Sequence, residues 1–262
     1  MKFFAVLLLL TLSLALDAFE GYNKWVGVFA KECGFRKQEI VTALQYKALL
    51  QKIKPWDQKG YFVSDLKYGD GKWVAVVSQG DAVFSEKIIS DGRWVDFREK
   101  MRELWKQGVW LVDLEYGMGR WVGVFSDDLR YKAQYYSANS EIDRLDYLID
   151  EGWSWHYKLT EIAFGENRWV LIFAKGTKYR NQRYERADSW SDAYEIIEEQ
   201  WSKGKDLIEI EYALGKWVMV FAMHTGYLNQ RYMSRNTLEA FVSRAKALRE
   251  KGYFITDLAN GW

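Results

Sequence analysis

The spacing of hydrophobic residues changes along the chain in a fixed order, and this order predicts β-strands followed by a helix. An alternating segment such as 61–68 leads through a glycine-rich turn at 69–71 into an apolar run at 73–77, a combination typical of a β-hairpin. Because the run at 73–77 is apolar on both faces, we expect it to be the buried middle strand of a sheet.

A third strand and an amphipathic helix complete the pattern. Segment 179–184 is short and polar, so we expect an exposed third strand there. Apolar side chains then recur at helical spacing until a glycine, Gly108, ends the helix. The residues on this helical face are Trp94, Phe97, Met101, Leu104 and Trp105. Each unit is therefore predicted to be βββα.

The unit is repeated five times without a change of frame. Its marker is a tryptophan every 48 residues, each after Lys or Arg, at Trp25, Trp73, Trp121, Trp169 and Trp217. A carboxylate precedes each tryptophan by eight residues, at Asp17, Asp65, Asp113, Glu161 and Glu209, with Asp257 next in phase. A period of 20 to 50 residues indicates a repeat architecture.

The two ends of the repeat predict how the units assemble. The first unit lacks its first strand, whereas a complete one, 253–258, follows the last helix. We therefore expect a five-bladed α/β propeller-like ring of 48-residue units, with the last strand completing the first blade and the helices outside. An open solenoid is the alternative.

The first residues have the pattern of a secretory signal peptide. Met1 and Lys2 precede the apolar stretch 3–16, which is short for a membrane span and ends among small residues. The prediction is a signal peptide at 1–18, a single domain at 19–262, and a secreted or periplasmic protein without a transmembrane segment after cleavage. An uncleaved anchor is the alternative.

Composition argues against several kinds of partner. The formal net charge is +1, so no basic footprint for nucleic acid is present. Two histidines 68 residues apart, with a single cysteine, give no zinc signature, and no phosphate-binding loop occurs. We expect no cofactor and no metal, and a core without an intramolecular disulfide.

Several segments resemble a known repeat region. They are 252–256 (GYFIT), 116–119 (YGMG) and 175–184 (KGTKYRNQRY). This pattern resembles the tandem-repeat domain that follows the kinase domain of plant casein-kinase-like kinases and also occurs in stand-alone bacterial proteins. The resemblance covers nearly the whole chain after residue 18 and implies a non-catalytic repeat domain of uncertain function.

Residues that recur in every unit are predicted to be structural. A ring needs the same bonds in each blade, so we expect the repeated carboxylates and the Gln or Glu thirteen residues after each tryptophan to bond to neighbouring blades. Positions that break the repeat are better candidates for a site. The connections after the second strands and after the helices share one rim, and the loops after the second strands carry Cys33, Asp127, Asp128, Arg130, Lys178 and His224.

The fourth unit differs most on this rim. Gly152 comes four residues early, which predicts an early helix end bridged by 153–157. The predicted ligand-binding residues are Trp155, His156, Tyr157, Lys178 and His224, for an unknown glycan, peptide or protein. These aromatic residues could instead simply cover the core.

An enzyme is the alternative class of function. Cys33 and His224 lie in nearly equivalent loops of the first and last units, and five-fold α/β propellers include cysteine-nucleophile enzymes. A thiolate nucleophile would need a base within ~3 Å, whereas the ring could hold these loops ~10 Å or more apart. The sequence therefore favours a non-catalytic binding or scaffold module with no catalytic residues.

Overall fold

The structure is a computed structural model that describes residues 23–80, 86–129 and 131–262. The predicted signal peptide at 1–18, Asp17 and Arg130 lie outside the described residues. Within the described residues, no helix is both long and apolar enough to cross a membrane.

The described strands form five three-stranded antiparallel sheets. Written from the outer to the inner strand, they are β2 (Phe35–Ala43), β4 (Lys72–Gly80) and β3 (Phe62–Gly69); β5 (Glu86–Asp91), β7 (Arg120–Ser126) and β6 (Trp110–Gly117); β8 (Ala133–Asn139), β10 (Arg168–Lys175) and β9 (Lys158–Gly165); β11 (Arg180–Ala187), β13 (Lys216–Met223) and β12 (Asp206–Ala213); and β14 (Leu228–Arg235), β1 (Lys24–Lys31) and β15 (Phe254–Gly261). The helices are α2 (Tyr46–Asp57), α3 (Trp94–Lys106), α4 (Leu145–Ser154), α5 (Trp190–Ser202) and α6 (Leu238–Arg249), with a 3-10 turn, η2 (Ile142–Arg144), before α4.

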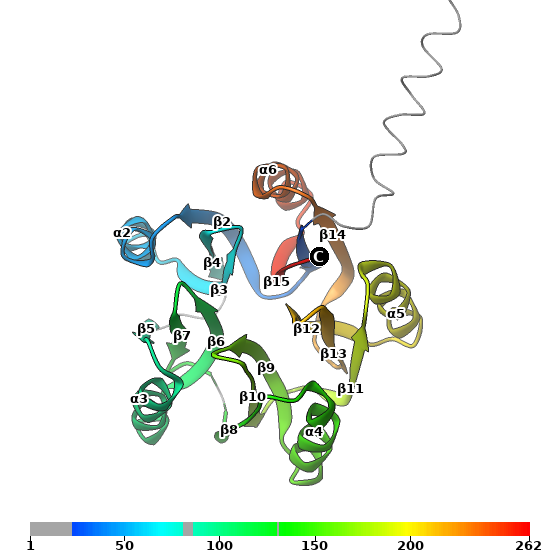
Figure 1. The fold of residues 1–262 in the computed structure, drawn as a ribbon. Helices are drawn as coiled ribbons and strands as arrows, with labels where there is room; N and C mark the ends of the chain where they lie inside the picture. The colour runs from blue at the N-terminus through cyan, green and yellow to red at the C-terminus, as the bar shows by residue number, and fades with distance from the viewer. Residues whose placement is uncertain (1–22, 81–85, 130) are drawn as a thin grey trace, which may run out of the picture.

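The sheets are arranged around a common centre, with the helices on the outside (Figure 1). The inner strands β3, β6, β9, β12 and β15 contact one another in this order, and β15 also contacts β3. As predicted, the middle strands are the most buried. Their five tryptophans, Trp25, Trp73, Trp121, Trp169 and Trp217, are completely buried.

The order of three strands and a helix is confirmed, but the outer strand of each sheet comes from the preceding unit. Strand β2 follows β1 along the chain, yet it pairs with β4, with Ala43 opposite Trp73. Its apolar side chains pack with Leu49 and Ile53 of α2, which leads into the same sheet. A hydrophobic pattern reports that a strand face is buried and not which strand it pairs with, so the sequence did not reveal this.

The sheet of β14, β1 and β15 brings together strands from the beginning and the end of the described chain. Trp25 of β1 lies opposite Asn260 of β15 on one side and Arg235 of β14 on the other. The predicted pairing of the last strand with the strand at Trp25 is confirmed. The sequence predicted that one strand from the end of the chain would complete this sheet, whereas two do so, β14 and β15.

Each inner strand contains a β-bulge just before its carboxylate. In β3, Val63 lies opposite Val77 and Asp65 opposite Val76, so Ser64 is the extra residue. The bulge shifts the alternation by one residue, so that Val63 and Leu66 both enter the core. Asp65 is left among the acidic side chains of other inner strands.

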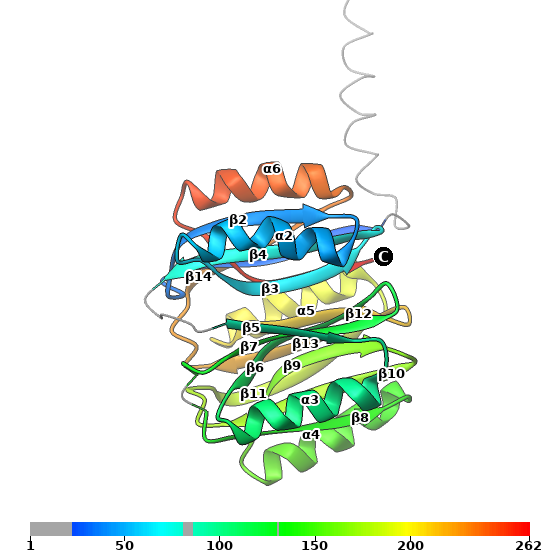
Figure 2. The same cartoon turned by 90° about the vertical axis from the view of Figure 1, so that its left-hand side faces the viewer.

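The ring of sheets has two ends, seen from the side in Figure 2. We call one end the turn rim: it carries the hairpin turns between inner and middle strands and the beginnings of the helices. We call the other end the loop rim: it carries the connections from middle to outer strands and from helices to inner strands. The predicted ligand-binding residues all belong to the loop rim.

Candidate functional site

An aromatic cluster lies on the loop rim beside the sheet of β8, β10 and β9. The ring of Tyr135 stacks on buried Phe173, with centroids 4.8 Å apart, and meets Tyr157 edge-on at 4.7 Å. The Trp155 ring lies 5.8 Å from Tyr135 and is 50% exposed. Two of the predicted residues, Trp155 and Tyr157, therefore share one surface, and Tyr135, which the sequence did not single out, joins them.

Gly152 makes room for this cluster and does not end the helix. It is buried within α4, and a Cβ there would lie 2.4 Å from the Tyr135 hydroxyl oxygen and 2.6 Å from the Phe173 ring. The predicted early helix end is therefore wrong, because α4 continues to Ser154. The glycine at this position is explained by tertiary packing of two rings, which local sequence does not reveal.

His156 takes the place of a glycine. Its N–H donates to the Trp153 carbonyl at 2.9 Å, just as the N–H of Gly108 donates to Trp105 and that of Gly204 to Trp201. The backbone is left-handed, with φ of 63° at His156 against 74° at Gly108. A side chain in this conformation costs about 1–2 kcal/mol. Strain of this kind at an exposed rim is a reason to suspect function.

Tyr157 is less exceptional than its neighbours. Counting 48 residues along the chain places Tyr61 and Tyr253 at equivalent positions. The ammonium nitrogen of Lys175 lies 4.4 Å from the centroid of the Tyr157 ring, and that of Lys31 lies 4.8 Å from Tyr253. The fourth connection is therefore distinguished by Trp155 and His156, whose counterparts include Gln107 and Gly108.

The other predicted residues lie in the loops before β11 and β14. Lys178 is exposed, and its nitrogen lies 5.8 Å from the centroid of the Tyr227 ring. His224 is also exposed and left-handed, with φ of 63°. Lys178 therefore contacts the loop that carries His224. Among the described residues, no hydrogen bond or ring contact joins either of them to Trp155.

Cys33 has the surroundings of an unactivated thiol. Its Sγ lies 3.6 Å from the Ala30 carbonyl oxygen, and burial raises the pKa of the thiol despite the nearby charge of Lys178. Within the described part of the chain, no hydrogen bond links Cys33 to His224. A nucleophilic cysteine requires a lowered pKa and a base within reach. The geometry therefore gives no support to a catalytic pair.

The centre of the ring is lined by carboxyl groups. Burial, followed by the charges of other acids, raises the pKa of Asp65, Glu161 and Asp257 well above the usual range. The Asp257 carboxylate accepts a hydrogen bond from the Ile210 N–H on the adjacent inner strand at 2.5 Å. This bond confirms the predicted structural role of Asp257 between neighbouring sheets.

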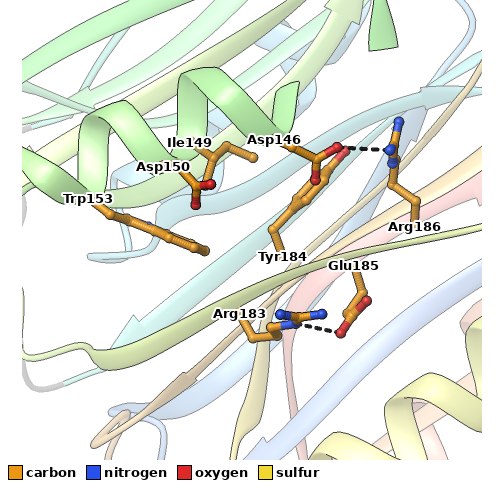
Figure 3. A pocket seen from close by; sticks show the side chains of 8 residues that line it. All are labelled: Asp146, Ile149, Asp150, Trp153, Arg183, Tyr184, Glu185 and Arg186. Carbon is orange, nitrogen blue, oxygen red and sulfur yellow. Dashed lines mark hydrogen bonds and ion pairs between the residues drawn. The ribbon is translucent and has the colours of Figure 1, made fainter. Parts of the chain in front are cut away.

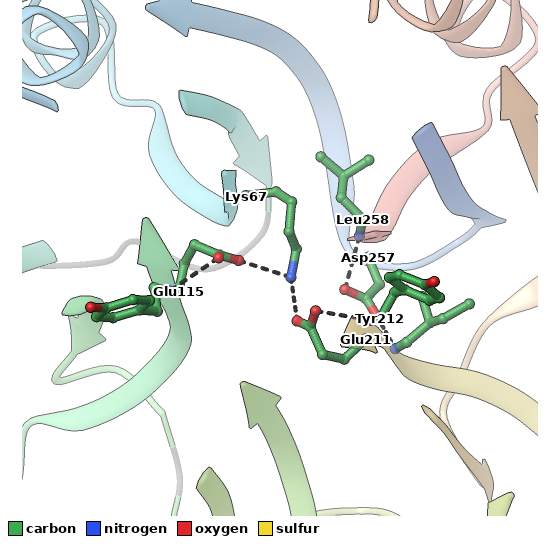
Figure 4. A network of polar contacts seen from close by, with 8 residues as sticks. Lys67, Glu115, Glu211, Tyr212, Asp257 and Leu258 are labelled. Carbon is green, nitrogen blue, oxygen red and sulfur yellow. Dashed lines mark hydrogen bonds and ion pairs between the residues drawn. The ribbon is translucent and has the colours of Figure 1, made fainter. Parts of the chain in front are cut away.

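One amine lies among these acids. Lys67 Nζ lies 2.9 Å from a Glu115 carboxylate oxygen and 2.7 Å from one of Glu211, as Figure 4 shows. All three side chains are more than nine-tenths buried. Of the described residues, no group of three or more His, Cys, Asp or Glu side chains is placed to hold a metal ion.

The repeated glutamines also join neighbouring sheets. Gln134 in β8 donates to the Leu111 carbonyl oxygen at 2.9 Å and accepts from the Leu111 N–H at 2.8 Å, which satisfies both backbone groups exposed near the bulge of β6. Gln182 makes the same pair of bonds with Leu159. The predicted structural role of these glutamines is confirmed.

A groove of about 310 Å³ lies between α4 and β11 (Figure 3). Four of its charged side chains pair with one another: Arg183 is 2.6 Å from Glu185, and Arg186 is 2.8 Å from Asp146. The indole N–H of Trp153 donates to Gln182 Oε1, whereas the buried Tyr184 hydroxyl has no hydrogen-bonding partner among the described residues. Because most of its charged groups are already paired, this groove is a weaker candidate than the aromatic cluster.

Comparison with known families gives one match. Residues 107–261 match the model of a family described as a domain of unknown function, DUF7477, and the chain belongs to this family. A comparison with curated proteins found no match. The resemblance to the repeats of casein-kinase-like kinases stays a prediction.

Proposed function

We propose that this member of a family without assigned activity is a non-catalytic binding or scaffold module. The five sheets act as a closed, propeller-like scaffold, and the loop rim presents a ligand surface centred on Trp155. The ligand is a glycan, peptide or protein, met outside the cytoplasm. This proposal does not require a cofactor.

The exposed position of Trp155 carries the proposal. Equivalent connections have polar residues such as Gln107 and Lys203 there, which cost nothing to solvate. A half-exposed tryptophan held against Tyr135 offers a large rigid surface with little entropy to lose on binding. Large aromatic side chains of this kind are common anchors in interfaces.

Polar groups on the same rim supply directional contacts. His156 extends from the strained backbone beside Trp155, and Lys178 and His224 are exposed on neighbouring loops. An apolar anchor with a few polar groups nearby is the usual composition of a specific binding surface. These residues are predicted contacts.

The test is a glycan and peptide array read with the purified chain, followed by titration of the hits. Trp155→Ala should weaken binding ~30-fold or more, because an anchor of this size contributes about 2 kcal/mol or more. Its melting temperature should stay close to that of the wild type. Trp262→Ala is the matched control, since Trp262 is an exposed tryptophan on the turn rim.

Three outcomes would count against the proposal. An array without hits would leave the loop rim without a ligand of the proposed classes. Equal binding by Trp155→Ala and the wild type would place the contact surface elsewhere. A fast reaction of Cys33 with a thiol reagent at neutral pH would instead favour the enzyme alternative.

A further inference from the structure

Exposed apolar side chains are concentrated on the turn rim, opposite the proposed ligand surface. Nine large hydrophobic side chains of the described residues are exposed. Six belong to the turn rim or to the first helical turns that begin there, and Tyr194 lies in the second turn of α5; the six are Leu44, Val95, Met118, Tyr147, Leu214 and Trp262. Only Trp155 and Leu228 lie on the loop rim. This asymmetry indicates that the turn rim faces something other than water.

Two of these side chains occupy positions that suit polar residues. In equivalent hairpin turns, Asp70 accepts a hydrogen bond from the Trp25 indole at 2.7 Å, and Glu166 accepts one from the Trp121 indole at 2.9 Å. The carboxylates satisfy two buried indole N–H groups. A carboxylate is therefore the stabilising choice at this turn position.

Met118 and Leu214 replace that carboxylate. The corresponding indole N–H groups, those of Trp73 and Trp169, are buried without a hydrogen-bonding partner among the described residues. The backbone is left-handed at all four turns, with φ of 51° and 53° at Met118 and Leu214 and 49° and 46° at Asp70 and Glu166, so the turns differ in the missing acceptor and not in strain. Each apolar residue thus leaves a buried donor unsatisfied, which destabilises the fold.

The start of the described chain supplies the reason to look for a lipid surface. Strand β1 begins at Lys24, which lies opposite Gly261 on the turn rim. The apolar stretch 3–16 is separated from Lys24 by only seven residues, 17–23. Seven residues reach at most ~25 Å. If this stretch stays on the chain as an uncleaved anchor, the alternative to a signal peptide, the lipid that receives it lies within this distance of the turn rim.

We propose that the turn rim rests on a membrane surface, with Met118, Leu214 and Trp262 inserted into its interfacial layer. They come from three different sheets around the ring, so they define a plane across this end of the molecule. Tryptophan favours the interface between lipid and water. The loop rim then faces away from the membrane, independently of which ligand it binds.

Insertion of apolar side chains, and not attraction between charges, is the main contribution to membrane binding in this proposal. The middle strands begin with basic residues, but Lys72 pairs with Glu239 and Lys216 with Asp188 on the same rim. The carboxylates of Asp70 and Glu166, in turns of the same rim, offset part of the charge of Lys24, Arg120 and Arg168, so the net attraction for anionic lipid is small. Contact should therefore depend only weakly on salt and on the fraction of anionic lipid.

The test uses the full chain with one fluorescent label at a time. In a Cys33→Ser background, Trp262→Cys places the label on the turn rim, and Leu228→Cys places it on the loop rim as a matched control. Vesicles of phosphatidylcholine and phosphatidylglycerol carry a spin-labelled lipid that quenches nearby fluorescence. We expect quenching and a blue shift at position 262, and neither at position 228.

A second variant separates membrane contact from folding. Met118→Asp with Leu214→Glu restores the acceptors that Asp70 and Glu166 provide in other turns. The melting temperature should rise, because two indole donors gain partners, while quenching at position 262 should disappear. A folded, more stable protein that no longer touches lipid cannot be explained by misfolding.

Three results would overturn the proposal. One is no quenching at position 262, and another is equal quenching at positions 262 and 228. The third is a concentration-dependent dimer that Met118→Asp with Leu214→Glu abolishes, since a second copy would then cover the rim. None of these depends on Trp155, so failure here leaves the proposed ligand surface intact.

Discussion

Gln38 and Ile255, 217 residues apart in sequence, are joined by two hydrogen bonds. The Gln38 amide nitrogen donates to the Ile255 carbonyl oxygen at 2.9 Å, and its side-chain oxygen accepts from the Ile255 N–H at 2.7 Å. One side chain therefore satisfies both backbone groups of a residue in the last strand. These bonds link the sheet of β2, β4 and β3 to the sheet of β14, β1 and β15.

Replacing Gln38 by Leu should lower the free energy of unfolding by about 1–3 kcal/mol, because two buried backbone groups would lose their partners. Chemical denaturation monitored by tryptophan fluorescence measures the change. Gln51→Leu, on the exposed face of α2, is the control and should change little. Equal effects of both substitutions would contradict the structural role of Gln38.

Glu86 occupies the corresponding position in the sheet of β5, β7 and β6 and should make stability depend on pH. Its carboxylate accepts from the Val63 N–H but, when ionised, cannot donate to the Val63 carbonyl. Burial raises its pKa to about 7. Because the pKa of Glu86 is higher in the folded than in the unfolded protein, the protonated carboxyl stabilises the fold. This stabilisation is complete at pH below the unfolded pKa and is lost as pH rises through 7.

Glu86→Gln should therefore stabilise the protein at pH 8 by at most ~3 kcal/mol and have little effect at pH 4. Thermal unfolding of both proteins between pH 4 and 8 measures this difference. Parallel pH profiles for the two proteins would show that Glu86 does not titrate in this range.

Lys67 is expected to hold the centre of the ring together. Lys67→Met leaves Glu115 and Glu211 buried without a cation, which should cost about 3–5 kcal/mol at pH 9, where the Glu115 carboxyl is ionised. Burial raises the pKa of Glu115 to about 8, so the loss should shrink at pH 6, where this carboxyl is neutral. Urea denaturation at both pH values measures the difference.

A compensating variant is the control for Lys67. Adding Glu115→Gln and Glu211→Gln to Lys67→Met should recover most of the lost stability. Lys72→Met, which breaks a solvent-exposed pair with Glu239, should change stability little. A similar loss from Lys67→Met and Lys72→Met would argue against a central role.

His156→Gly should raise stability by ~1 kcal/mol, because glycine adopts the left-handed backbone without strain. If His156 also contacts the ligand, binding should weaken in the same variant. Calorimetry of unfolding and of binding separates the two effects. A lower melting temperature would show that the histidine side chain stabilises the connection.

Deletion of 253–262 should give unfolded or aggregated protein. It removes β15, which pairs with β1 and contacts β12 and β3, together with buried Ile255 and Leu258. Each of these side chains contributes ~1.5–3 kcal/mol when buried. Circular dichroism and light scattering distinguish the outcomes. A folded monomer would show that the remaining sheets do not need the last strand.

The sequence by itself determined the units and the order of their elements. The 48-residue period locates the hairpins, the buried strands at the five tryptophans and the helices, because hydrophobic periodicity reports local burial directly. It also separated residues that recur, such as Gln134 and Asp257, from those that break the repeat, such as Trp155.

Only the tertiary structure decided how these elements join. It assigned β2 to the sheet of β4 and introduced the bulges that place Asp65 and its equivalents at the centre. It also showed that Gly152 is needed because the Tyr135 hydroxyl lies too close to leave room for a Cβ. A local pattern can report that a residue is buried or exposed. It cannot identify a partner dozens of residues away, because that choice depends on packing and hydrogen bonds that exist only once the sheets meet.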